Sequence, residues 1–474
     1  MNWSKIMLFC WVFLNGAIAQ GQDIHPKSAQ HYLAYPFIDV SANRLINKQY
    51  LEPFYFKLTQ LKNGERDKVT ILHIGDSHIQ ADLWTGKLRR LFQQYFGSAG
   101  RGLFFPFQLI GSHNPLDIST HTNATWEGHT SAFRDGPPMG VCGAGMRTKQ
   151  SDFYIDIIVK DSLPTDKFNQ VTLFNQKGAS AYNYILGKGD VKKIDVDRVP
   201  VKPRYHRVRS GNTLWGISRK YHVSVRQLQR WNNMRGSRLK IGRRLIVSKP
   251  RYKKAKTPDF EKFAYLANME YPDSIYRATL VLDRPVNQLV IKGDKLTPDQ
   301  KECVFYGCLL ENTLQKGILY DAVGVNGTTF YHYNHAKYFF DQIALLKPDL
   351  VIVSLGTNEA LSSGFDADKF SEQVNTFFDH LSEELPEVPV IITSNGDALR
   401  KKKYTTPNNS AVRDRLAITA STRNYAYWDL NTIMGGEESI RDWQKSGLAG
   451  KDYIHLTKKG YQILGELLFD AVVE

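Results

Sequence analysis

The feature that most constrains the fold is a set of short, nearly continuous apolar runs, each ending in small polar residues. Runs of this kind are typical of parallel strands that are buried on both faces. Amphipathic helical patterns follow most of them, and this alternation predicts an open α/β sheet that binds ligands at the carboxyl ends of its strands. The predicted strands span 69–74, 318–325, 350–355, 388–393 and 425–430, and the predicted helices span 82–95, 335–346, 368–385, 410–422 and 457–473.

About 240 residues of a different texture separate the first of these strands from the second. Short alternating runs spaced by turn residues, such as 153–159 and 288–292, predict an antiparallel β-rich domain inserted into the α/β domain. The stretch 191–260, whose edges are rich in Pro and Lys, interrupts this β-rich domain in turn. The predicted boundaries are 30–110 and 317–474 for the α/β domain, 111–200 and 258–316 for the β-rich domain, and 204–249 for the innermost domain.

The net charge of +15 is concentrated in one segment of the 474-residue chain. Residues 201–250 hold 14 Lys and Arg and no Asp or Glu, whereas the rest of the chain carries 48 basic and 47 acidic residues. A near-neutral body therefore carries one strongly basic segment, which favours attraction to anionic polymers. A basic segment with Trp and Tyr is also found in nucleic-acid-binding proteins, but these aromatic residues fall at core spacing, so we expect no nucleic-acid partner.

The N-terminus has the layout of a secretory signal peptide over residues 1–19. Lys5 precedes an apolar run at 6–14 that is too short to span a bilayer comfortably, and Ala17 and Ala19 supply the small residues of a cleavage site. The alternative is a buried N-terminal helix. We expect an exported protein, periplasmic or on the cell surface, with no integral membrane segment after the signal is removed.

Cleavage would leave three cysteines, Cys142, Cys303 and Cys308, of which at most one pair can close internally. Cys303 and Cys308 are the local candidates for a disulfide, and the alternative is that all three are small buried hydrophobes. Because the chain has no CxxC motif and no Cys/His cluster with zinc spacing, we predict no metal site.

The basic segment has a recognisable order of elements. A short strand and a turn at 210–212 precede a helix with Leu214 and Ile217 on one face, and Ser224 caps a second helix with Leu228 facing inward before a closing strand. This βααβ pattern resembles a LysM domain over its whole length. The resemblance implies binding of peptidoglycan or another N-acetylglucosamine-containing glycan. It places the sugar groove at Gly211, Asn212, Thr213 and Leu214, facing the loop near Asn233 and Met234.

Four blocks of the α/β domain carry residues suited to acyl transfer. Ser77 follows a buried strand, where a helix begins, and Asp452 and His455 lie three residues apart before the last helix. A carboxylate at this spacing can fix the imidazole tautomer while the other ring nitrogen faces the serine. Asn358 ends another strand, where its amide can point at a developing oxyanion, and Gly327 offers a backbone N–H that can approach a substrate closely.

These blocks, in this order, resemble the SGNH (GDSL) hydrolase superfamily, whose flavodoxin-like parallel sheet is the α/β fold expected here. The resemblance assigns Ser77 as nucleophile, His455 as general base and Asp452 as the residue that orients His455. It assigns Gly327 and Asn358, with the Ser77 N–H, to the oxyanion hole, and Gly143 competes with Gly327 for this role. No metal or organic cofactor is required by such a mechanism.

The expected export, the esterase blocks and the LysM pattern together predict a carbohydrate esterase that removes O-acetyl groups from peptidoglycan. Three alternatives remain open. The first is an O-deacetylase of another polysaccharide or a lipase-like acylhydrolase. The others are a non-catalytic peptidoglycan-binding protein and an acetyltransferase that passes the acyl group to a sugar.

Overall fold

The computed structural model describes residues 26–474 except 131, 133–137, 161–166, 177, 179, 190–197, 202, 235, 249–250, 255–259, 267–276 and 406. Its centre is a five-stranded, all-parallel sheet, as the apolar runs predict. The strand order is β17 (Gly317–Gly324), β1 (Lys68–Gly75), β18 (Leu350–Ser354), β19 (Val390–Thr393) and β20 (Ala426–Trp428). β1 therefore lies between the strands that carry the glycine and asparagine blocks.

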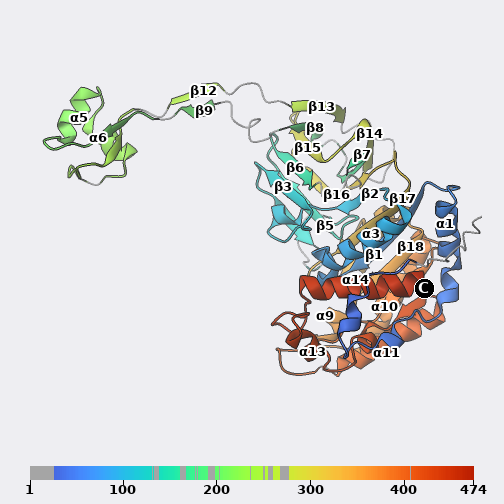
Figure 1. Ribbon diagram of the computed structural model, residues 1–474. Coiled ribbons are helices and arrows are strands. Elements are labelled where there is room, and N and C mark those ends of the chain that lie inside the picture. The colour runs from blue at the N-terminus through green and yellow to red at the C-terminus, as the bar shows by residue number, and fades with distance from the viewer. Residues whose placement is uncertain are drawn as a thin grey trace, which may run out of the picture.

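Helices cover both faces of this sheet (Figure 1). One face packs against α1 (Glu52–Lys62), α3 (Leu83–Phe96) and α14 (Lys458–Val473), and the other packs against α7 (Phe330–Asn334), α8 (Phe339–Ala344), α10 (Ala367–Glu384) and α11 (Asn408–Thr422). Helical spacing explains the packing of α3, because Trp84, Leu88 and Leu91 recur on its buried side. Gly97 ends that helix at φ 81°, and a Cβ there would lie 2.4 Å from the Lys316 carbonyl oxygen.

Two antiparallel sheets form the inserted domain, which lies beside the parallel sheet (Figure 1). β16 pairs with β5 along its first half and with β2 along its second half, so that β2, which falls within the predicted first part of the α/β domain (30–110), takes part in the β-rich domain. One buried core runs from the interior of the β-rich domain to the α7, α8 and α10 face of the parallel sheet. The first sheet contains β13 (Phe260–Leu266), β8 (Asn183–Gly189), β15 (Gln288–Asp294), β6 (Tyr154–Val159) and β3 (Ile118–Thr122); the second contains β14 (Arg277–Val286), β7 (Phe168–Asn175), β16 (Cys303–Glu311), β5 (Ala144–Thr148), β4 (Glu127–Thr130) and β2 (Gly100–Phe104).

The innermost unit has the predicted βααβ order and its own small core. β10 (Tyr205–Arg207) pairs antiparallel with β11 (Arg244–Ile246), and α5 (Leu214–Lys220) and α6 (Val225–Trp231) lie between them in the chain. Ser224 and Gln227 form the capping box that begins α6. A two-stranded ribbon of β9 (Arg198–Val201) and β12 (Arg251–Lys254) lies between this unit and the β-rich domain (Figure 1).

Of the two alternatives for the cysteines, a Cys303–Cys308 disulfide or buried, unpaired thiols, the structure shows the second. Cys142, Cys303 and Cys308 are all buried and free. Cys303 and Cys308 lie five residues apart on the single extended strand β16, which separates them by roughly 16 Å, far beyond the span of a disulfide.

The predicted signal peptide, residues 1–19, lies outside the described residues. Among the helices of the described ranges, none is both long enough and apolar enough to cross a membrane.

Candidate active site

Three adjacent parallel strands end at one edge of the sheet, and their loops form the candidate active site. Gly75 at the end of β1 pairs with Gly324 of β17 and with Ser354 of β18. Two residues beyond Gly75, Ser77 begins the short helix α2 (Ser77–Gln80). The buried carboxylate of Asp76 caps this helix by accepting the His78 N–H at 3.0 Å, so the turn that presents Ser77 is fixed locally.

Ser77, His455 and Asp452 form a continuous hydrogen-bonded relay. Ser77 Oγ lies 2.9 Å from His455 Nε2, and His455 Nδ1 lies 2.7 Å from Asp452 Oδ2. Asp452 Oδ1 also accepts the backbone N–H groups of Ile454 and His455, each at 3.1 Å. Burial raises the pKa of Asp452, but these hydrogen bonds outweigh it and bring the pKa below its usual value. The ionised carboxylate therefore holds Nδ1 protonated and leaves Nε2 free to accept the serine proton.

A second histidine packs against the relay. The ring centroids of His78 and His455 are 5.3 Å apart, and His78 Nδ1 lies 2.9 Å from the Tyr461 hydroxyl. Burial lowers the pKa of His78, so its ring stays neutral beside the general base. A neutral ring here supports His455 sterically without opposing the positive charge that His455 acquires.

Of the two competing glycines, Gly327 has the better geometry for the oxyanion hole. Gly143 donates its N–H to the Gly140 carbonyl at 2.8 Å, so that donor is already used in a turn. Gly327 is exposed at φ 76°, and its N–H makes no hydrogen bond within the described part of the chain.

Asn358, in α9 (Thr357–Ala360), lies beside the Gly327 loop. Its Nδ2 donates to the Thr328 carbonyl at 2.8 Å and lies 3.5 Å from Asp76 Oδ2. The contact with Asp76 is long and therefore weak. The amide hydrogen that makes it is the one that remains available to an oxyanion.

Glu359 has a role that the sequence analysis did not identify. Its Oε1 accepts the Phe330 N–H at 2.9 Å, which fixes the start of α7 directly after the Gly327 loop. Its Oε2 is buried and has no hydrogen-bond partner among the described residues. Burial, with a smaller contribution from Asp76, raises the pKa of Glu359 to about 7.

Gln80 is a second residue that sequence reasoning missed. It ends α2, is buried, and accepts the Asn326 N–H at 2.7 Å, one residue before Gly327. Its position three residues after Ser77 is the only local signal, because the partner lies about 250 residues away.

The predicted glycan residues of the innermost unit gather around its first turn. Gly211 adopts φ 82°, and the Asn212 side chain closes the turn by accepting the Arg209 N–H at 2.9 Å. Thr213 caps α5, and Leu214 is buried in the core, so Leu214 could offer a glycan only its backbone. Asn233 is left-handed at φ 49°, in the loop after α6.

The aromatic residues of this unit were expected to lie at core positions, and this expectation is wrong for Trp215. Its side chain is 65% exposed, and the Arg219 guanidinium lies 5.4 Å from its ring centroid.

Comparisons with known proteins find family matches in two parts of the chain. Residues 293–463 match the model of the GDSL-like lipase/acylhydrolase family, and residues 206–248 match the LysM domain. The structure described as "Peptidoglycan O-acetylesterase in action, 5 min" aligns with 92% of this chain and 96% of its own, with a TM-score of 0.60 and 19% sequence identity. At that identity the likeness shows a shared fold.

The curated relatives match only a small part of the chain. Membrane-bound lytic murein transglycosylase D of Escherichia coli (strain K12) is 34% identical over 82 residues, which are 16% of this chain and 18% of that protein. Probable endopeptidase p60 of Listeria innocua is 42% identical over 45 residues, 10% of each chain. The chain thus spans less than a fifth of the length of these relatives.

The fold and the site define a serine-esterase domain built on a parallel α/β sheet. More narrowly, the chain contains a GDSL-like lipase/acylhydrolase domain and a LysM domain. The family match begins at residue 293, and the structure brings Ser77, from the first part of the interrupted domain, to the histidine within the matched region.

Proposed function

We propose that this chain is an exported serine esterase that removes O-acetyl groups from peptidoglycan. The observation that carries the proposal is the Ser77–His455–Asp452 relay in a chain that also contains a LysM domain. The fold shared with a protein described as a peptidoglycan O-acetylesterase supports the choice of substrate, as does the identity with murein-acting proteins.

In the proposed reaction, Ser77 Oγ attacks the acetyl carbonyl carbon while its proton passes to His455 Nε2. The N–H groups of Ser77 and Gly327 and the Asn358 amide stabilise the oxyanion. The bond between the acetyl carbon and the sugar oxygen then breaks, and the sugar oxygen takes the proton from His455. A water molecule attacks the acyl-enzyme, giving its proton to His455, and acetate leaves as Ser77 Oγ is reprotonated.

A groove that begins at the end of α2, the helix of Ser77, offers space for the glycan. It encloses about 620 Å³ and has one wall from the α/β domain, with Ala81, Leu83 and Lys458, and one from the β-rich domain, with His113 and His121. Ala81 follows α2 directly, and Lys458 lies three residues after His455. A groove of this size falls within the range of ligand-binding sites in proteins.

The decisive experiment compares acetate release from O-acetylated peptidoglycan by the mature protein and by Ser77→Ala. We expect release by the former and none by the latter. If neither releases acetate, p-nitrophenyl esters of increasing acyl length distinguish the alternatives. Ser77-dependent cleavage of such esters would keep the nucleophile and change the substrate, whereas no cleavage would favour a non-catalytic wall-binding protein.

Transfer rather than hydrolysis is tested in the same assay by adding sugar acceptors. An O-acetylated sugar product in place of free acetate would identify an acetyltransferase.

A further inference from the structure

The loop that carries Gly327 is held from two sides by side chains of neighbouring segments. On the Asn358 side, Asn358 Nδ2 donates to the Thr328 carbonyl at 2.8 Å, and Glu359 Oε1 accepts the Phe330 N–H at 2.9 Å. On the nucleophile side, Gln80 Oε1 accepts the Asn326 N–H at 2.7 Å. Gln80 is thus the side chain that ties the helix of Ser77 to the residue before Gly327.

The second half of the Gln80 amide is held by the inserted β-rich domain. Gln80 Nε2 donates to Ser112 Oγ at 2.6 Å, and Asn326 Nδ2 lies 3.4 Å from the same hydroxyl. Ser112 follows the short helix η4 (Phe107–Ile110), which packs against β3 and β4. The three side chains therefore join the nucleophile helix, the Gly327 loop and the inserted domain at one point.

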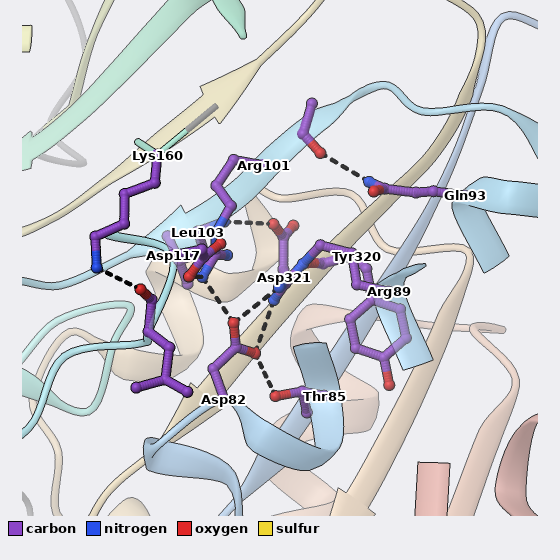
Figure 2. A network of polar contacts seen from close by, with 12 residues as sticks. Asp82, Thr85, Arg89, Gln93, Arg101, Leu103, Asp117, Lys160, Tyr320 and Asp321 are labelled. Carbon is purple, nitrogen blue, oxygen red and sulfur yellow. Dashed lines mark hydrogen bonds and ion pairs between the residues drawn. The ribbon is translucent and has the colours of Figure 1, made fainter. Parts of the chain in front are cut away.

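A buried ion network ties the segment that follows the nucleophile helix to the inserted domain (Figure 2). Arg101 on β2 contacts Asp82 Oδ2 at 2.7 Å and Asp117 Oδ2 at 2.5 Å, and Arg89 binds both oxygens of Asp82. Burial raises the pKa of Asp82, but the two guanidinium groups outweigh it and bring the pKa to about 2. Asp82 lies two residues after Gln80 and Asp117 lies five residues after Ser112, so the network fixes the segments from which both side chains project.

We propose that Gln80 is a positioning residue for the oxyanion hole and that Ser112 holds its amide in place. The β-rich domain then supports the acyl-transfer step itself, in addition to any contact that it makes with the glycan. The hydrogen bond to the Asn326 N–H restricts the backbone of the residue before Gly327. The Gly327 N–H then keeps the direction that an oxyanion needs. The inference rests on the proposed function, because it requires Gly327 to be an oxyanion donor.

The test uses the full chain with p-nitrophenyl acetate, a soluble ester too small to report on glycan binding. Gln80→Met removes both hydrogen bonds of the Gln80 amide and keeps a similar side-chain volume. We expect kcat to fall about 10- to 100-fold and KM to stay within about twofold, because only the stabilisation of the transition state is lost. Ser112→Ala leaves the Gln80–Asn326 bond and is expected to lower kcat about three- to tenfold, and Ser112→Thr, which keeps the hydroxyl, to restore it.

Gln93→Met is the matched control. Gln93 also uses its amide on backbone groups, the Gly100 and Ile318 carbonyls, but it lies on α3 away from the Gly327 loop, so kcat should stay within about twofold. A kcat for Gln80→Met equal to that of the control would overturn the role of Gln80. If Gln80→Met does not fold, Ser112→Ala decides, because wild-type kcat in that variant would remove the β-rich domain from the acyl-transfer step.

Hydrogen exchange separates this inference from the proposed function. The backbone amides of residues 325–329 should exchange faster in Gln80→Met than in wild type, and their exchange rate in Gln93→Met should equal that of wild type. Both expectations hold whether or not the ester is cleaved. If wild type and Ser77→Ala are equally inactive, the proposed function fails and exchange alone judges the positioning. Equal exchange in Gln80→Met and wild type would refute it.

Discussion

Glu359→Gln should remove a pH-dependent loss of stability that the structure builds into the catalytic domain. Glu359 has one carboxylate oxygen that accepts the Phe330 N–H and one buried oxygen without a hydrogen-bond partner among the described residues. Burial raises its pKa from 4.5 to about 7 in the folded state. The glutamine keeps an oxygen for the Phe330 N–H but cannot ionise.

The sign follows from proton binding in the two states. Below pH 4.5 both states hold the proton, and the group costs nothing. Between pH 4.5 and about 7 the unfolded chain releases the proton while the folded protein keeps it, so the free energy of unfolding falls as pH rises. Above about pH 7 both states are ionised and the full cost remains. A shift of this size corresponds to about 3 kcal/mol.

The assay is urea unfolding from pH 4.5 to 8, followed by the fluorescence of the buried tryptophans Trp84, Trp428 and Trp443. Glu359→Gln should gain up to about 3 kcal/mol over wild type across this range, nearly all of it by pH 7. Glu372→Gln, at an exposed position of α10, removes a carboxylate without changing the core. A difference between Glu359→Gln and wild type that does not vary with pH would refute the reasoning, because it would mean that Glu359 ionises as easily in the fold as in water.

Three further predictions concern the site and the LysM domain. Asp452→Asn should lower kcat on p-nitrophenyl acetate about 10²- to 10⁴-fold, because an amide donating to His455 Nδ1 would leave the proton on Nε2; a loss under about threefold would contradict the relay. Gly327→Ala should cost about 1 kcal/mol in unfolding and lower kcat about tenfold or more, since φ 76° is strained for alanine while the nearest atom to its Cβ, that of Ala132, lies 3.8 Å away; unchanged kcat would remove Gly327 from the oxyanion hole. Deleting 202–256 should leave cleavage of soluble esters intact and weaken sedimentation with insoluble peptidoglycan, more so at low salt; equal sedimentation would mean that the LysM domain does not supply the binding.

The strands and the relay could be predicted because their signals are local. An apolar run such as 350–355 indicates by its composition that it is buried, and Asp452 and His455 are close enough in sequence to come from one loop. Ser77 was predicted with them because it directly follows a buried apolar run, where a helix begins. In each case a short segment carries the information, and the fold only brings the segments together.

The contacts that could not be predicted are those in which one side chain serves a distant segment. Glu359 lies in α9 but accepts the N–H of Phe330, which begins α7. Gln80 gives no sign in sequence of its bonds to Asn326 and Ser112. The pairing of β2 with β16 likewise depends on how the inserted domain returns to the sheet.

The two nested insertions differ in how they are joined, and the difference bears on function. The chain leaves the α/β domain after Gly97 and returns at Gly317, where the Ile318 N–H donates to the Gly97 carbonyl at 2.9 Å. This entry point lies beside α3 and β2, so the outer insertion is tied to the segment that follows Ser77 by the buried contacts of Arg101.

The inner insertion leaves at Gly189 and returns at Phe260, which are paired residues of neighbouring strands in the β-rich domain. An insertion between paired strand ends leaves the parent sheet intact and needs no packing against it. The β9–β12 ribbon and a separate hydrophobic core then make the LysM domain a unit of its own. Such an arrangement suits a domain that raises the effective concentration of the esterase site at the wall without taking part in the reaction. In the proposal above, the outer insertion by contrast supports the acyl-transfer step itself.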